Sequence, residues 1–305
     1  MTTPRRAAVL GGNRTPFARQ FGAYAEAANQ DMLTAAIEGL VARHGLAGER
    51  LGEVVAGAVI KHSRDFNLTR EAVLGSSLSP TTPAYDITQA CGTGLEAAIL
   101  VANKIALGQI ESGIAGGADS ASDAPVVVTE SLRRKLLRLN RAKTSADRVK
   151  AALAFRPTDV GVSVPANTEP RTGLSMGDHM ALTAAQWGVT REAQDELALA
   201  SHVNLAAAYE RGFFDDLLTP YLGLTVDQNL RPGSTLEKLG SLKPVFGKGE
   251  GATMTAGNST PLTDGASAVL LGSQEWADAH GLKPLAWFVD GETIRIGAHD
   301  WTVIT

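Results

Sequence analysis

Cys91, the single cysteine of this sequence, is the residue best placed to act as a nucleophile. It follows a short extended run and precedes Gly92, where an apolar pattern predicts the start of a long helix. A helix N-terminus carries about half a positive charge and unpaired N–H groups, and both favour a thiolate over a thiol. Gly92 and Gly94 leave room beside the sulfur for a substrate. Such a thiolate could attack an acyl carbonyl, with the Cys91 N–H facing the developing oxyanion.

The position of Cys91 alone leaves a structural role equally open, because free cysteines are among the most buried residues of proteins. Spacing places none of the six histidines beside it; they are His44, His62, His179, His202, His280 and His299. The sequence contains no HExxH, P-loop, paired CxxC or Gly-rich dinucleotide motif. A single cysteine also excludes an intrachain disulfide and a cysteine-rich metal site.

A second segment that could bind a ligand is Thr255–Ala266, which reads TAGNSTPLTDGA. Its small residues, hydroxyl pair and asparagine could hydrogen-bond an amide-rich ligand arm. The same composition is typical of a plain turn, and composition alone favours the turn.

These residues lie in an alternation of predicted strands and helices. Strands are predicted at Ala7–Leu10, Glu53–Ile60, Ala84–Thr88, Ser112–Ala118, Ser267–Gly272 and Leu285–Val289. Helices are predicted at Asp31–Arg43, Gly92–Leu107, Thr190–Arg211 and after Ser273. The strand, helix and strand around Cys91 form a βαβ unit, which predicts a parallel sheet. Gly113, Gly116 and Gly117 are interpreted as sites of close sheet packing.

The region from Ala121 to about Met254 departs from this alternation and reads as an insertion between strands. Within it, Arg133–Lys150 holds eight Lys or Arg residues against one acid, Asp147. The stretch is interpreted either as a solvated helical face or as a surface that attracts acyl-CoA phosphates, anionic lipid or an acidic partner.

Composition excludes several classes of protein. The chain has 305 residues, 44% of them hydrophobic and 20% charged, which is typical of a globular protein rather than a disordered one. Its net charge of −4 gives the whole molecule no excess of positive charge that would attract nucleic acid. No apolar run approaches the ~20 residues that span a bilayer. A cytoplasmic location is therefore expected.

Taken together, the motifs resemble those of the thiolases, the acyl-CoA acetyltransferases. The resemblance rests on RTPF from Arg14, QACGTGLEAA around Cys91, AGGADS from Ala115, SMG from Ser175, LGSLKPVF from Leu239, and the Thr255–Ala266 segment. It covers about Arg6 to Glu292. The amino-acid sequence around Cys91 is most similar to that of thiolases of fatty-acid oxidation, including β-subunits of the trifunctional complex. It implies a layered α/β fold with a mixed, mostly parallel sheet, made of an N-terminal half with an inserted loop domain.

The resemblance also implies a reaction and its site. Cys91 would attack a 3-ketoacyl-CoA, release acetyl-CoA and pass the acyl group to free CoA; the reverse reaction would condense acetyl-CoA. Coenzyme A would be a substrate, with no permanently bound cofactor and no metal. Arg231 would contact the nucleotide end of CoA, and Met176 would line the pantetheine and acyl channel. Ser259 and Thr260 would bind the pantetheine arm, with Thr260 the better match.

Thiolases continue into a second half whose histidine and second cysteine complete the catalysis, and the motifs of that half are missing here. The predicted organisation is a thiolase N-terminal domain at residues 1–275, with the inserted region at about 121–254, and the start of a truncated C-terminal domain at 276–305. The tail Thr293–Thr305 fits no family pattern. Low or no turnover is expected from this chain alone.

The competing interpretation is a catalytically inactive, thiolase-derived protein that binds acyl-CoA or a partner. A condensing synthase of the same fold is disfavoured by the SMG segment and by Thr255–Ala266. The family further implies self-association, and it leaves open a hydratase/dehydrogenase subunit of β-oxidation and peripheral membrane contact.

Overall fold

The computed structural model describes residues 5–247, 249 and 251–292. The tail Thr293–Thr305, with His299, lies outside the described residues. The chain divides into two compact units. A small unit comprises Ala124–Asn167, and the described residues before and after it form the core unit.

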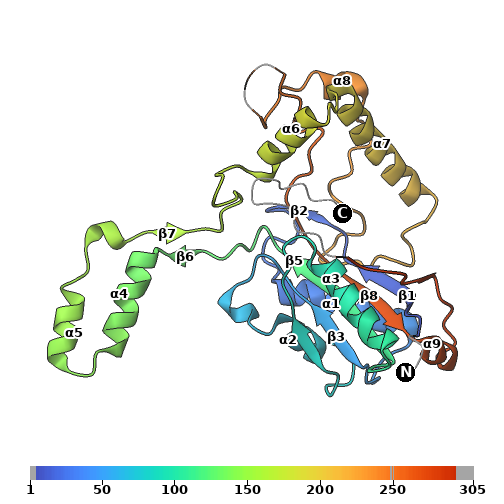
Figure 1. Cartoon of the computed structure of the whole chain (residues 1–305), viewed down its shortest axis with the longest axis horizontal. Coiled ribbons are helices and arrows are strands. Elements are labelled where there is room, and N and C mark those ends of the chain that lie inside the picture. The colour runs from blue at the N-terminus through green and yellow to red at the C-terminus, as the bar shows by residue number, and fades with distance from the viewer. Residues whose placement is uncertain (1–4, 248, 250, 293–305) are drawn as a thin grey trace. The chain divides into compact units, whose positions relative to one another are not determined.

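A mixed seven-stranded sheet forms the centre of the core unit (Figure 1). Its strands are β1 (Ala8–Arg14), β2 (Ala18–Arg19), β3 (Glu53–Ala56), β4 (Ala84–Asp86), β5 (Ser112–Asp119), β8 (Thr263–Gly272) and β9 (Ala286–Trp287). They lie in the order β4-β3-β5-β8-β1-β9, and β2 pairs with the start of β8. β3 is parallel to β4 and β5, whereas β8 is antiparallel to β5, β1 and β2, and β9 is antiparallel to β1. Strands β1 to β5 therefore run one way and β8 and β9 the other, which confirms the layered α/β fold with a mixed sheet.

Helices cover both faces of this sheet. Val54 and Leu270 belong to an apolar cluster shared with α1 (Asn29–His44) and α2 (Leu68–Leu74). Their neighbours Val55 and Leu271 belong to a second cluster, shared with α3 (Thr93–Ala106). Because successive strand residues point to opposite faces, α1 and α2 pack on one face and α3 on the other.

Most predicted elements of the core unit are confirmed, and their ends follow local chemistry. α1 ends at Gly45, whose φ of 66° is the left-handed cap that glycine favours. Ser273 caps α9 (Gln274–Ala279) by accepting a hydrogen bond from the Trp276 N–H. The predicted strand Glu53–Ile60 is shorter, because β3 stops at Ala56. Leu95 shares the apolar spacing of Ile99 and Ala102 in α3, which are buried, yet it is 60% exposed.

The region predicted as an insertion contributes to both units. Its later part supplies helices α6 (Met176–Gln186), α7 (Arg191–Glu210) and α8 (Leu236–Gly240) to the core unit. Its earlier part is the small unit, with α4 (Glu130–Arg141), α5 (Ser145–Ala152) and the paired strands β6 (Val127–Val128) and β7 (Val162–Ser163). None of the described helices has the length and apolar character needed to cross a membrane.

Candidate active site

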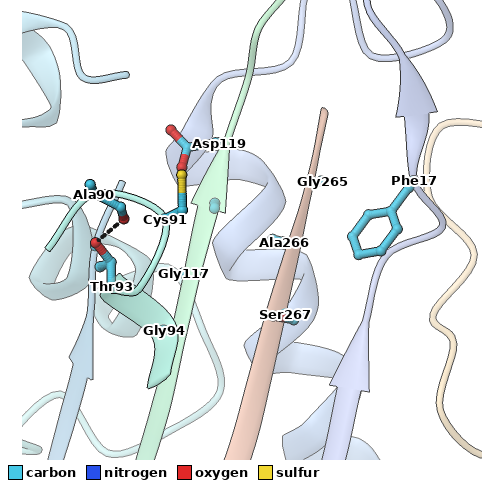
Figure 2. A pocket seen from close by; sticks show the side chains of 12 residues that line it. Phe17, Ala90, Cys91, Thr93, Gly94, Gly117, Asp119, Gly265, Ala266 and Ser267 are labelled. Carbon is cyan, nitrogen blue, oxygen red and sulfur yellow. Dashed lines mark hydrogen bonds between the residues drawn. The ribbon is translucent and has the colours of Figure 1, made fainter. Parts of the chain in front are cut away.

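The turn between β4 and α3 presents Cys91, which is exposed. Ala90, just before it, has a φ of 45°, in the left-handed region that non-glycine residues rarely adopt. Thr93 fixes this turn from both sides: its hydroxyl donates to the Ala90 carbonyl at 2.7 Å (Figure 2) and accepts from the Gln89 N–H at 2.8 Å. A strained backbone held by specific bonds is typical of functional positions.

The first N–H groups of α3 are partly used by the same turn. The Gly92 N–H donates to the Gln89 carbonyl at 3.0 Å, and the Thr93 N–H donates to the Ala90 carbonyl at 3.2 Å. Two of the N–H groups at this helix N-terminus are therefore paired within the turn. The positive end of the helix still lies beside the thiol.

Cys91 lines a cavity of about 240 Å³ beside the end of β5 and the start of β8 (Figure 2). Glycines form much of its floor. A Cβ atom would lie 2.0 Å from the Ile87 carbonyl oxygen at Gly57, and 2.9 Å from the Gly57 oxygen at Gly117. This confirms close sheet packing as the role of Gly117. The bare backbone leaves space above the sheet that the thiol can reach.

Phe17 forms the aromatic wall of this cavity, across from Cys91. The Arg14 guanidinium lies over the ring, 4.5 Å from its centroid, and binds Asp227 through two bonds of 2.7 and 2.9 Å. Asp227 also accepts the Phe17 N–H at 2.7 Å. Burial alone would raise the pKa of Asp227, but its bonds to Arg14 and Phe17 lower it below its usual value. The ion pair therefore holds Phe17 by both its ring and its backbone.

Asp119, at the end of β5, lines the same cavity. Its carboxylate accepts the N–H groups of Val59 and Ile60 at 2.9 and 2.8 Å, which fixes the loop after β3. Burial raises the pKa of Asp119, although these two bonds oppose the shift. Sequence patterns alone gave no role to Asp119 or Phe17. The position of Asp119, a polar residue at the carboxyl end of a buried strand, could have indicated a role at the site.

A second, larger cavity of about 1330 Å³ opens between α6, α7, α8 and the segment 254–261. Arg231, Ser259 and Thr260 line it, as three of the four predicted CoA-contacting residues. Met176 does not line either of these two cavities; Met180, one turn further along α6, lines the larger one. Roles for all four residues remain predictions.

The larger cavity has a cationic side made by Arg231 and Lys238. His202 of α7 lies there and accepts the Arg231 N–H at 3.4 Å through Nδ1. Burial and then the Arg231 charge lower the pKa of His202, so the ring is neutral at neutral pH. Sequence spacing gave His202 no role.

Asn258 organises the start of the segment Thr255–Ala266 through hydrogen bonds to residues inside and outside the segment. The Asn258 amide donates to Asp195 at 3.0 Å and to the Thr253 carbonyl at 3.1 Å, and its oxygen accepts the Thr255 N–H at 2.7 Å. This asparagine therefore shapes the loop instead of offering itself to a ligand. The Ser259 hydroxyl is buried without a hydrogen-bond partner among the described residues, whereas Thr260 is exposed.

The same segment connects the two cavities. Pro261 lines the larger cavity and Gly265 lines the one at Cys91. Four residues of chain span at most about 14 Å. The two cavities therefore have lining residues within about 14 Å of one another.

Neither a metal site nor a histidine is found in the described lining of the Cys91 cavity. Groups of three or more His, Cys, Asp or Glu residues suited to a metal ion are absent from the part of the chain that the structure describes. The residues lining the Cys91 cavity include no histidine. What the site offers is a nucleophile, a helix N-terminus and space for an acyl group.

Comparisons with known proteins agree with this geometry. The sequence model described as "Thiolase, N-terminal domain" matches residues 7–275. The 3-ketoacyl-CoA thiolases of Pectobacterium carotovorum and Photorhabdus laumondii are each 41% identical to this chain over 288 residues, which is 92% of the chain and 66% of each relative. The chain thus spans slightly less than two thirds of their length.

Solved structures of an acetyl-CoA acetyltransferase and of a 3-ketoacyl-CoA thiolase are also similar to this chain. The crystal structure of the Bacillus anthracis acetyl-CoA acetyltransferase is similar with a TM-score of 0.79 and 27% identity, over 94% of this chain and 70% of that one. Human mitochondrial 3-ketoacyl-CoA thiolase in complex with CoA has a TM-score of 0.77 and 27% identity, over 94% and 69%. With a strained turn presenting a cysteine at a helix N-terminus, and with a family match over most of its length, the chain belongs to the thiolase family.

Proposed function

We propose that this chain is the nucleophile-bearing part of an acyltransferase that cleaves 3-ketoacyl-CoA through an acyl-cysteine at Cys91. The observation that carries the proposal is the position of Cys91, exposed on the strained turn at the start of α3 in a cavity of about 240 Å³. The names of the relatives, 3-ketoacyl-CoA thiolases and an acetyl-CoA acetyltransferase, supply the substrate class.

The proposed chemistry has two steps. The Cys91 thiolate attacks the 3-keto carbon, and the bond between C2 and C3 breaks. Its electron pair stays on C2, which takes up a proton, so that acetyl-CoA leaves and the acyl group remains on sulfur. The thiol of a free CoA then loses its proton to a base and attacks the acyl carbon, and Cys91 leaves as the thiolate. The helix N-terminus stabilises negative charge on the sulfur in both steps.

The larger cavity is the proposed site for CoA. Arg231 and Lys238 offer cations to its phosphates, and the apolar wall with Thr260 suits the pantetheine arm. The complex of human mitochondrial 3-ketoacyl-CoA thiolase with CoA supports CoA as the ligand. The proposal includes self-association, a cytoplasmic location and a hydratase/dehydrogenase partner as predictions from the family resemblance.

Turnover by this chain alone is expected to be low. Thiolysis needs a base that takes the Cys91 proton and an acid that protonates the leaving carbanion. The described lining of the Cys91 cavity supplies no histidine for the first task. In thiolases, as the resemblance implies, the second half supplies both groups.

Intact-mass measurement of the chain with acetoacetyl-CoA tests the proposal. We expect an acetyl increment that is absent in Cys91→Ala and is removed by added CoA. A chain that binds CoA in calorimetry but gains no increment would support the alternative, an inactive acyl-CoA-binding protein. A folded chain that shows neither binding nor increment would contradict both.

We also propose that the small unit contacts an anionic surface. Its helix α4 has no buried residue, and Leu136 and Leu137 on it are exposed. Arg138 and Arg141 of α4 and Lys143 after it are exposed as well. A basic helix with exposed apolar residues suits the interface of an anionic membrane.

A further inference from the structure

Phe17 is the one large apolar side chain among the described residues that line the smaller cavity. Four of the other lining residues are glycines and three are alanines, and the rest are Cys91, Thr93, Asp119 and Ser267. Phe17 is 37% exposed, and Figure 2 shows its ring across the start of β8 from Cys91. A group that is bound to the sulfur and fills this cavity therefore meets the ring.

The position of the Phe17 ring is fixed by contacts on several sides. The Phe17 N–H donates to the Asp227 carboxylate at 2.7 Å, and its carbonyl oxygen accepts the Gln228 N–H at 2.9 Å. The Arg14 guanidinium lies 4.5 Å from the ring centroid and is itself bound by Asp227. Rotation of the ring would break its contact with Arg14, and movement of its backbone would break two hydrogen bonds. The ring is therefore a fixed boundary of the cavity.

The size of the cavity sets how long an apolar chain it can hold. Its volume is about 240 Å³. Taking about 30 Å³ for each non-hydrogen atom, the share of a water molecule in the liquid, the cavity holds about eight such atoms. A hexanoyl group is within this size, and a decanoyl group exceeds it. The floor is the backbone of the sheet, so further apolar space would have to come from the side chain at position 17.

We propose that Phe17 determines the acyl-chain preference of the site, restricting the acyl group on Cys91 to short chains of about six carbons. This inference rests on the proposed function, in which CoA takes the larger cavity and the acyl group stays on the sulfur. A longer chain would either displace the anchored ring or leave its end in water, where it gains no apolar burial. The substrates that fit are therefore short-chain 3-ketoacyl-CoA thioesters.

Alkyl chains attached to Cys91 test this limit without acyl transfer. Alkyl methanethiosulfonates from methyl to decyl place a linear chain on the sulfur through a disulfide. Intact mass confirms a single label, because Cys91 is the only cysteine. Each methylene that the cavity buries should raise the thermal midpoint of the labelled chain by about 1–2 °C. We expect the midpoint to rise up to about the hexyl label and then to level off or fall.

Three variants show whether Phe17 sets the limit. Phe17→Ala should move it to longer chains by about two to four carbons, because the space of the ring becomes available. Phe17→Leu keeps an apolar side chain and should lie between the two. The matched control is Phe66→Ala, which removes a phenylalanine that is 82% exposed and lines neither cavity, and it should keep the original limit. Each labelled chain is compared with its own unlabelled form, which cancels the effect of the substitution itself on stability.

Three outcomes of the alkyl series would overturn the proposal. One is the same limit in Phe17→Ala and in the unmodified chain. Another is an equal shift in Phe66→Ala. The third is a Phe17→Ala chain that gains less from every label than the unmodified chain does, because the ring would then attract the alkyl chain instead of stopping it.

Acyl-CoA thioesters separate this inference from the proposed function. Hexanoyl-CoA should acylate Cys91 at least about tenfold faster than decanoyl-CoA, and Phe17→Ala should reduce this ratio to less than about threefold. Acylation that does not depend on chain length would leave Cys91 as the nucleophile and refute the role of Phe17. No acylation of any variant, together with a limit that moves in the alkyl series, would contradict the proposed function and leave the ring as the boundary of the cavity.

Discussion

The ring of Phe17 lies against the backbone of Gly265, so closely that a Cβ atom on Gly265 would come within 2.4 Å of the ring. Both residues line the Cys91 cavity. The pairing of Ala18 with Asp264 places the two chain segments beside one another at this point. The width of the cavity therefore depends on the missing side chain at Gly265.

Gly265→Ala should displace the Phe17 ring. Gly265 does not have a left-handed φ, so the added methyl is costly through this contact and not through backbone strain. We expect a loss of about 1–3 kcal/mol in the free energy of unfolding, measured by urea titration, and a changed rate of Cys91 alkylation. The double variant Phe17→Ala with Gly265→Ala should recover part of the lost stability. Full additivity of the two single variants would contradict the contact.

Gly94→Ala tests the opposite case, a glycine that faces open space. A Cβ atom on Gly94 would meet no heavy atom within 4 Å, yet Gly94 lines the Cys91 cavity in the first turn of α3. Alanine favours a helix over glycine by up to ~1 kcal/mol, so the variant should be at least as stable as the unmodified chain. Its methyl group should slow acylation of Cys91 by acyl-CoA.

Gly240→Ala is the matched control for that variant. Gly240 ends α8, also has open space at its Cβ, and lines neither cavity. It should leave acylation unchanged. A Gly94→Ala chain that acylates at the rate of the Gly240→Ala chain would show that substrates do not approach over the helix N-terminus.

The Arg14–Asp227 pair should make a large contribution to stability that depends on both partners. Asp227 is 7% exposed, and removing one partner of a buried pair costs about 3–5 kcal/mol. We expect Arg14→Met and Asp227→Asn each to lower the free energy of unfolding, with the double variant less destabilised than the sum. Because the pKa of Asp227 is lowered in the folded state, this stability is present above its unfolded pKa and lost as pH falls through the folded pKa.

The burial of His44 should make the stability of the fold depend on pH near neutrality as well. Its Nε2 is buried without a hydrogen-bond partner among the described residues, packed over Gly11 of β1. Burial, and then the charge of Arg43, lower the pKa of His44 from 6.5. The unfolded chain therefore takes up this proton first, and stability falls as pH drops below about 7. His44→Gln should flatten the stability curve between pH 7.5 and 5.5; an unchanged slope would contradict the assignment.

Most helices and strands of the core unit could be predicted because the patterns that indicate them lie within each segment of the sequence. Apolar periodicity indicated α1 and α3, and the glycines of β5 indicated close packing. The order of the strands could not be predicted, because β4 and β5 are joined through α3 yet pair with β3 and not with each other. Motif spacing gave Cys91, but Asp119 and Phe17 reach the cavity only through the folded sheet. Leu95 followed the apolar pattern of its helix and is exposed all the same.

Internal ion pairs occupy some of the cations of the basic small unit and leave others exposed. Neutralising the first three cations of α4 would mainly break internal pairs, because Arg133 and Arg134 bind Glu130 and Lys135 binds Asp159. Arg138, Arg141 and Lys143 are exposed and make no ion pair among the described residues. Their charges are the ones available to an anionic surface.

Replacing these three residues with glutamine should therefore weaken flotation of the chain with phosphatidylglycerol vesicles. Near a surface each cation contributes about 1 kcal/mol, so loss of three should reduce binding by roughly two orders of magnitude at low salt. The Arg133, Arg134 and Lys135 triple variant is the control, and it should bind more tightly than the first despite the same change in net charge. Equal binding by both triple variants would assign the effect to net charge, and binding that salt does not alter would exclude the membrane surface as the partner.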